Sequence, residues 1–302
     1  MDRARYRSRF APSPTGALHL GSLVAAVGSY LAARHARGEW LIRIEDLDPP
    51  REVPGSAQDI LDSLAQLGFE WTEPVVRQSG RLAAYALAAD RLLQSGQAYE
   101  CSCSRAEIAA DQATPGHGDE LHYPGWCRNG LRAPERPRAL RLRVPDESVC
   151  FQDAIQGTIS TNVAADVGDF VIRRRDRLFA YQLAVVVDDA AQAISHVVRG
   201  ADLLSSTPRQ ILLQRALGLA TPAYAHLPLV LDQDGVKLSK SAGAAAVEGR
   251  QAVAELWRAL CLLRQNPPAH LRRGPKRTLW DWAIEHWTTV PLRGLRTAPW
   301  IS

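Results

Sequence analysis

The chain reads Arg9-Phe10-Ala11-Pro12-Ser13-Pro14-Thr15-Gly16-Ala17-Leu18-His19-Leu20-Gly21-Ser22 near its beginning. The first three residues predict a short strand that stops at Pro12, and the spacing of apolar residues from Leu18 to Arg37 predicts a helix. Gly16 permits an unusual φ in the turn between them. In a parallel sheet, such a turn presents free backbone N–H groups and the positive end of a helix to an anion. We therefore predict a phosphate site at this turn.

The rest of the first hundred residues continues the same alternation. Trp40 to Ile44 is a compact apolar strand, and Gly55 to Leu67 and Arg81 to Gln94 have the pattern of helices. Alternating strands and helices predict an α/β fold, in which helices cover the faces of a parallel sheet. Residues 1–96 are interpreted as the first half of this domain.

The composition changes in residues 97–176, where cysteine, histidine, glycine and proline cluster. We interpret this segment as an insertion. Its predicted strands are Arg138–Val144, Gly157–Val163 and Phe170–Arg173.

The α/β pattern resumes in residues 177–241, the second half of the domain. The elements predicted there are a buried strand at Leu183–Val187, a helix at Ser206–Leu217 and a strand at Leu227–Leu231. Residues 242–302 are predicted to form a short helical subdomain. We expect its tryptophans to act as packing anchors rather than as platforms for nucleic-acid bases.

The overall composition favours a globular enzyme. Of the 302 residues, 46% are hydrophobic and 23% are charged, which excludes disordered and fibrous classes. No stretch reaches the ~18 apolar residues of a membrane-spanning helix, and the N-terminus lacks the apolar core of a secretory signal. Five cysteines are a small and odd number, which does not suit a scaffold of paired disulfides. We predict a cytoplasmic protein without a membrane partner.

Almost all of the basic residues in the chain are arginines. The chain holds 36 basic residues and a net charge of +4, and its only lysines are Lys237, Lys240 and Lys276. Two of the three lie in Lys237-Leu238-Ser239-Lys240-Ser241. Chance clustering in a solvated turn is one interpretation, and a loop that brings compact ammonium groups to phosphates is the other.

The two motifs together favour the second interpretation. His19-Leu20-Gly21 alone is weak, because a capped helix with a surface histidine explains it. A later loop with two ammonium groups and two hydroxyls suits the charge of a triphosphate that breaks between its α and β phosphates. Their order in one α/β domain predicts a nucleotide site.

These motifs resemble signatures of class I aminoacyl-tRNA synthetases. His19-Leu20-Gly21-Ser22 is similar to the HIGH signature, and residues 237–241 are similar to KMSKS. The segments at 11–20, 43–48 (Arg-Ile-Glu-Asp-Leu-Asp) and 185–189 (Val-Val-Val-Asp-Asp) resemble the glutamyl/glutaminyl branch. The resemblance covers roughly residues 9–241.

The resemblance implies a Rossmann-type catalytic domain that uses MgATP to convert an amino acid to an aminoacyl-adenylate. It assigns His19, Lys237 and Lys240 to catalysis, and His19, Gly21 and Lys240 to ATP binding. Ser22 departs from the last letter of HIGH, so no second catalytic histidine is assigned.

A pocket for L-glutamate needs an acid for one ammonium group and several donors for two carboxylates. Arg9 could form a forked contact with a carboxylate, Glu45 could pair with the ammonium, and Tyr181 and Arg199 could complete the pocket. With Ser13, these positions match the glutamate-contacting residues that the resemblance implies. For any one of them, an ordinary surface ion pair is the alternative.

Three cysteines predict a structural zinc site in the insertion. Cys101 and Cys103 are followed 24 residues later by Cys127, and Zn²⁺ requires four ligands. The candidates for the fourth are His117, His122 and Tyr123. Imidazole is the commoner ligand, but Tyr123-Pro124-Gly125-Trp126-Cys127-Arg128 resembles a segment of shortened glutamyl-synthetase paralogues in which the tyrosine binds zinc. We choose Tyr123, with His122 as runner-up and three ordinary buried thiols as the alternative. Cys150 and Cys261 are expected to be packing residues.

The segment at 21–26 also resembles those shortened paralogues, and only 61 residues (242–302) follow the KMSKS-like loop. The resemblance implies glutamate activation without tRNA, followed by transfer to queuosine in the anticodon of tRNA(Asp). One alternative is a minimal glutamyl synthetase that charges a tRNA 3′ end. The other is a non-catalytic paralogue that only binds tRNA.

Overall fold

The computed structural model describes residues 6–110, 121–236, 238, 247 and 251–299. The strands are β1 Arg7–Phe10, β2 Glu39–Ile44, β3 Val76–Arg77, β4 Ala98–Cys101, β5 Ala139–Leu142, β6 Ser148–Asp153, β7 Gly157–Asn162, β8 Val171–Arg173, β9 His196–Gly200, β10 Ala223–Leu227, β11 Leu229–Val230 and β12 Thr297–Ala298. The α-helices are α1 Leu20–His35, α2 Ser56–Leu67, α3 Leu82–Gln94, α4 Arg105–Ala110, α5 Val163–Asp166, α6 Tyr181–Ala191, α7 Thr207–Leu217, α8 Ala252–Leu262 and α9 Lys276–His286.

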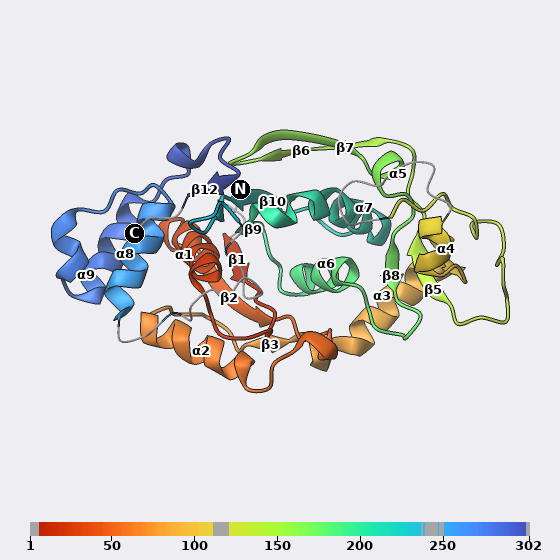
Figure 1. Cartoon of the computed structure of the whole chain (residues 1–302), viewed down its shortest axis with the longest axis horizontal. Helices are drawn as coiled ribbons and strands as arrows, with labels where there is room; N and C mark the ends of the chain where they lie inside the picture. Colours follow the sequence, from red (N-terminus) through yellow and green to blue (C-terminus); the bar gives the residue numbers. More distant parts are fainter. Residues whose placement is uncertain (1–5, 111–120, 237, 239–246, 248–250, 300–302) are drawn as a thin grey trace.

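The predicted α/β architecture is confirmed. Strands β1, β2 and β3 form a parallel sheet in which Arg9 lies opposite Leu41. A second sheet has the order β7-β6-β10-β9, and β9 and β10 are parallel. The two sheets adjoin where β9 lies beside β1, and the backbone N–H of Ser195 donates to the Arg7 carbonyl there. Helix α1 packs against both β1 and β9 at the centre of the molecule (Figure 1).

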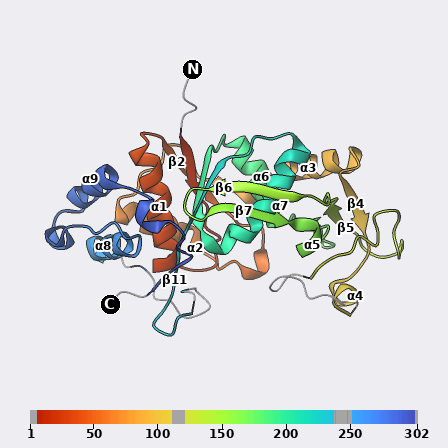
Figure 2. The same ribbon diagram turned by 90° about the horizontal axis from the view of Figure 1, so that it is seen from above.

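The insertion contributes strands to two different sheets. Strands β4, β5 and β8 form a separate antiparallel sheet at one end of the molecule (Figure 1). The β6–β7 hairpin instead joins the sheet of the second half, because β6 pairs with β10. Seen from above, this hairpin runs along α7 (Figure 2).

The prediction of a strand at Leu183–Val187 is wrong, because this segment lies in α6. A short run of buried apolar residues fits a buried helix as well as a buried strand, and periodicity alone does not separate them. Helix α6 packs between α3 and α7, so its apolar residues are buried around most of its circumference.

The single strand predicted at Leu227–Leu231 is also wrong in detail. The segment holds the end of β10 and the separate short strand β11, which pairs with β12 near the C-terminus. Pro228 lies between them. Proline has no backbone N–H to continue a ladder, which accounts for the interruption.

The C-terminal helices pack on α1, at the opposite end of the molecule from β4 and β5 (Figure 1). Trp280 of α9 lies edge-on to Tyr30, with ring centroids 4.9 Å apart, and its indole N–H donates to the Leu67 carbonyl at 3.0 Å. The expected packing role is confirmed for Trp280 and for the buried Trp287. Across the described residues, no helix has the length and apolarity needed to cross a membrane.

Candidate active site and metal cluster

The turn between β1 and α1 is held by contacts from neighbouring segments. The Pro12 carbonyl accepts from the backbone N–H of Glu45 at 3.0 Å, and the Pro14 carbonyl accepts from Val53 at 2.9 Å. Gly16 has φ +133°, a region that side chains disfavour. The turn is therefore fixed on both sides before α1 begins.

His19 caps α1 and is held by Ser22. The backbone N–H of Ser22 donates to Nδ1 of His19 at 3.4 Å, and the Ser22 hydroxyl lies 2.9 Å from Nε2. No acidic residue occupies the first turn of this 16-residue helix, so no side-chain negative charge offsets the positive end of its dipole there. Ser22, which departs from the family signature, thus orients the histidine.

Gly21 brings the two nucleotide motifs together. A Cβ on Gly21 would lie 3.1 Å from both Cε1 of His19 and the backbone oxygen of Leu238. A side chain at position 21 would therefore press against the backbone of Leu238, which lies close to the start of α1. Lys237 and Lys240 lie outside the described residues, but Leu238 between them is buried beside Gly21.

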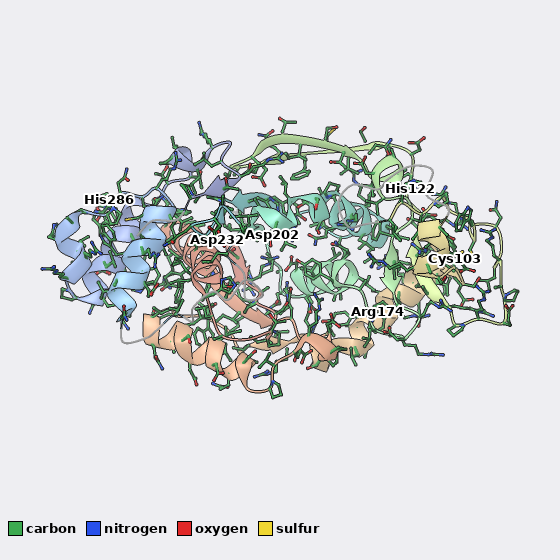
Figure 3. The ribbon with its side chains drawn as sticks, viewed as in Figure 1. Cys103, His122, Arg174, Asp202, Asp232 and His286 are labelled. Atoms are coloured by element: carbon green, nitrogen blue, oxygen red, sulfur yellow. The ribbon has the colours of Figure 1, made fainter. Side chains whose placement is uncertain are left out.

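A cavity of about 780 Å³ opens along this turn and the ends of β1 and β9. The described sequence-predicted residues on its wall are Arg9, Ser13, His19, Gly21, Tyr181 and Arg199. Leu238 and Asp202 also line it, and Figure 3 shows Asp202 near the centre of the molecule. The structure therefore brings the predicted phosphate turn and most of the predicted amino-acid pocket to one cavity.

Glu45 stands apart from the cavity wall. It follows the last residue of β2, and its carboxylate lies 3.4 Å from Nη2 of Arg43. Burial raises the pKa of Glu45, while the guanidiniums of Arg43 and Arg9 act in the opposite direction. Tyr181, the first residue of α6, has a pKa raised by burial, so its hydroxyl stays protonated and able to donate.

Arg9 is anchored by an acid that the sequence analysis did not assign. Its Nε and Nη2 donate to the two carboxylate oxygens of Asp189 on α6, at 3.0 and 3.4 Å. Nη2 of Arg43 also donates to Asp189, at 2.8 Å. All three side chains are buried. The sequence signal for Arg43 and Asp189 is that each is a charged residue within or next to an apolar segment, which indicates a buried charge.

The charges in this cluster compensate one another. Burial alone would raise the pKa of Asp189, but Arg9 and Arg43 hold it below its ordinary value. Burial acts to lower the pKa of Arg43, and Asp189 and Glu45 more than offset it. Asp189 is therefore ionised, and it links β1, β2 and α6 beneath the cavity.

Arg199 of β9 lines the cavity, and one of its guanidinium nitrogens has no partner among the described residues. Its Nε donates to Nε2 of His226 at 3.0 Å, and its Nη2 donates to the Thr207 hydroxyl at 2.8 Å. Its Nη1 is buried and has no hydrogen-bond partner among the described residues. A buried guanidinium N–H without a partner is destabilising unless a ligand accepts from it.

The three predicted thiols lie together at the far end of the molecule. The Sγ atoms of Cys101, Cys103 and Cys127 are within 4.8 Å of one another, and all three residues are buried. Figure 3 shows Cys103 beside the β4–β5 sheet. Such a set suits a metal ion that prefers sulfur ligands.

The Tyr123 hydroxyl points into this cluster. It lies 3.3 Å from Sγ of Cys101 and 3.7 Å from Sγ of Cys103. Nε2 of His122 instead lies 3.0 Å from the Ala164 carbonyl, and His117 is outside the described residues. Gly168 has φ +71°, and a Cβ there would lie 2.0 Å from the Tyr123 carbonyl, so the backbone fixes this tyrosine closely.

The thiols differ in their electrostatics. Burial raises the pKa of Cys103 to about 12. Burial also opposes ionisation of Cys127, but hydrogen bonds from the backbone of Arg132 and Ser102 lower its pKa to about 6. Outside the cluster, the expected packing role of Cys150 is wrong: this residue is exposed on β6, because its side chain points to the solvent face of the hairpin.

The chain is similar to known proteins over nearly its whole length. The family described as tRNA synthetases class I (E and Q), catalytic domain, matches residues 5–263. A curated protein of Dechloromonas aromatica, named Glutamyl-Q tRNA(Asp) synthetase, is 58% identical over 97% of this chain and 98% of its own length. A protein of the same name from Pseudomonas aeruginosa is 50% identical over 97% of both chains.

The fold of the chain is also similar to that of a solved structure. The glutamate tRNA ligase of Elizabethkingia meningosepticum, in complex with its amino acid, superimposes with a TM-score of 0.78 at 30% identity. The match covers 98% of this chain and 67% of the ligase.

The ion cluster generates a prediction for Asp189→Asn. The substitution leaves two buried guanidiniums undercompensated, so the free energy of unfolding should fall by about 3–5 kcal/mol. Because the folded pKa of Asp189 is lowered, its contribution is present above the ordinary pKa of about 3.9 and is lost as pH falls through the lower folded value. Urea unfolding from pH 7 to pH 3 measures this.

Asp281→Asn is the control, because Asp281 is exposed and 3.9 Å from Arg277 on the same helix. It should change stability by under ~0.5 kcal/mol. Equal effects of the two substitutions at pH 7 would contradict the role given to Asp189.

Proposed function

The chain belongs to the family of class I tRNA synthetases for E and Q, and from this membership we propose that it activates L-glutamate with ATP and transfers the glutamyl group to queuosine in the anticodon of tRNA(Asp). The name of its full-length relatives supports this reaction over the two alternatives, a minimal synthetase and a non-catalytic tRNA-binding protein. The chain is accordingly a ligase. Because ATP and tRNA are cytoplasmic, we propose that location for the protein as well.

The unpartnered Nη1 of Arg199 is the observation that carries the glutamate assignment. Arg199 lines the same cavity as the β1–α1 turn, so one volume adjoins both a residue that can donate to a carboxylate and the proposed phosphate site. A carboxylate accepts from a buried guanidinium strongly. An uncharged side-chain amide would be a poorer partner there, which favours glutamate over glutamine.

We assign the other pocket residues by their position. Arg9 and Arg199 would receive the two carboxylates of glutamate, with Tyr181 and Ser13 adding hydroxyl groups. Glu45 would pair with the ammonium after its side chain moves away from Arg43. Asp189 holds Arg9 in place during these contacts.

The adenylation step would take place at the turn before α1. An oxygen of the glutamate α-carboxylate attacks the α-phosphorus of ATP, the bond to the bridging oxygen breaks, and pyrophosphate leaves. His19 and Lys240, assisted by Lys237, would stabilise the charge that develops on the phosphates. Gly21 leaves room for the nucleotide against α1, and Mg²⁺ enters bound to ATP as part of the substrate.

The transfer step would use the adenylate as the acyl donor. A hydroxyl of the queuosine cyclopentenediol attacks the activated carbonyl, its proton is lost, and AMP leaves. A loop nucleotide can be splayed out of its stack into a pocket, which is the usual way in which proteins read RNA specifically.

We propose that the cysteine cluster holds one structural Zn²⁺, with Cys101, Cys103, Cys127 and Tyr123 as ligands. The distances among these four side chains and the separate hydrogen bond of His122 support this set. Bound zinc would fix the loop between β4 and β5, the part of the insertion that we propose to meet the RNA.

Substitution of the lysines tests the catalytic assignment. Lys240→Ala should reduce glutamate-dependent ATP–pyrophosphate exchange by at least ~100-fold, the scale of one lost transition-state charge contact. Lys276→Ala is the matched control: the ammonium of Lys276, on α9, donates to the Gln66 carbonyl of α2, and exchange should be unaffected. Near-normal exchange by a folded Lys240→Ala variant would overturn the catalytic assignment.

Metal analysis tests the cluster. Protein purified without chelator should contain about one zinc ion per chain. Tyr123→Phe should weaken zinc retention less than Cys127→Ser, because a phenol oxygen is a poorer zinc ligand than a thiolate. Elemental analysis during dialysis against a chelator measures both, and metal-free wild-type protein would refute the site.

The RNA substrate gives a third test. An isolated anticodon stem-loop of tRNA(Asp) that carries queuosine should accept labelled glutamate, whereas the same stem-loop with guanosine and intact tRNA(Glu) should not. Transfer should weaken as salt rises, because arginine contacts to phosphate release counterions. Charging of tRNA(Glu) at its 3′ end would establish the minimal-synthetase alternative instead.

A further inference from the structure

Three buried side chains next to the cavity form a series of hydrogen bonds. They are Asp153 at the end of β6, His226 of β10 and Arg199 of β9, and each of them is at most 5% exposed. Nδ1 of His226 lies 2.6 Å from a carboxylate oxygen of Asp153. Nε of Arg199 lies 3.0 Å from Nε2 of His226. This series of hydrogen bonds therefore ends at Arg199, which lines the cavity and whose Nη1 has no partner among the described residues.

The direction of these hydrogen bonds follows from their chemistry. A guanidinium only donates, so Nε2 of His226 accepts and carries no proton. Nδ1 then carries the proton and donates to Asp153. Asp153 is itself held by the backbone N–H groups of Ile155 and Gln156, at 3.0 and 2.8 Å. One tautomer of His226 is thus selected by groups on both sides.

The surroundings of His226 favour its neutral form. Burial lowers the pKa of His226, the contact with Asp153 raises it, and the positive charges of Arg199 and Arg9 lower it. Tyr224 of the same strand stacks on the imidazole with an interplanar angle of 14°. Thr207, from α7, lies 3.2 Å from Nε2 and also accepts from Nη2 of Arg199.

Two of the three guanidinium nitrogens of Arg199 are therefore bound to the protein, and Nη1 is left for a ligand. We propose that His226 is a positioning residue for substrate recognition: as a neutral acceptor fixed by Asp153, it orients the guanidinium of Arg199 so that Nη1 meets a carboxylate of glutamate. This inference rests on the proposed function. It gives the β6–β7 hairpin a part in substrate affinity, because Asp153 ends β6.

Two substitutions separate positioning from packing. His226→Gln places an amide oxygen near the position of Nε2 and can still accept from Arg199. His226→Asn places an amide N–H near the position of Nδ1 and can still donate to Asp153, but it has no acceptor for Arg199. In tRNA-free ATP–pyrophosphate exchange, the Asn variant should raise the KM for glutamate about tenfold or more, as expected for a misdirected charge-assisted hydrogen bond. The KM for ATP should stay within about twofold.

His226→Gln should keep a KM for glutamate close to that of the wild type. A wild-type KM in the Asn variant, or equal increases in the KM for glutamate and for ATP, would overturn the positioning role. A wild-type protein without glutamate-dependent exchange would instead overturn the proposed function, on which the inference rests.

A measurement on the folded wild-type protein tests the tautomer without activity. In protein labelled with ¹⁵N-histidine, the signals that disappear in His226→Gln should show a protonated Nδ1 and an unprotonated Nε2. Asp153→Asn should alter these shifts and raise the KM for glutamate in the same direction as His226→Asn. A proton on Nε2 of His226 in the wild type would refute the arrangement.

Discussion

Asp189 is a full negative charge in the interior of the protein, and the site depends on its compensation by Arg9 and Arg43. The three residues come from β1, β2 and α6, so the ion cluster fixes these elements to one another beneath the cavity. A buried carboxylate without such partners would be strongly destabilising. The same contacts hold Arg9 at the cavity wall, so one set of bonds would serve both stability and the proposed recognition of glutamate.

Local sequence patterns are sufficient to predict secondary-structure elements whose signals lie within a few residues of one another. The strand, turn and helix at residues 9–37 were predictable because proline, glycine and helical spacing act within a few residues. The 183–187 segment was mispredicted as a strand, because only the surrounding helices make it helical. The hairpin at β6 and β7 joined the second sheet through a pairing with β10 that no local pattern encodes.

The candidate site also combines residues that local motifs predict with residues that only the structure reveals. His19 and Gly21 are predicted from their place before α1, from the later lysine motif and from the resemblance to the HIGH signature, and the structure places both on the cavity. The partners that hold the pocket, such as Asp189 and His226, are distant in sequence from the residues they orient. Their signal was a polar residue in an apolar segment, which marks burial of a charge but does not identify its partner. Ser22 was recorded only as a departure from a signature, and its contact with His19 required the structure.

We expect this cavity to activate glutamate without RNA. The test is ATP–pyrophosphate exchange by purified wild-type protein that has been freed of nucleic acid, with glutamate, glutamine or no amino acid. We predict exchange with glutamate alone, little exchange with glutamine, and no stimulation when tRNA(Glu) is added. Exchange that appears only after addition of a tRNA, or that is as fast with glutamine as with glutamate, would contradict the account.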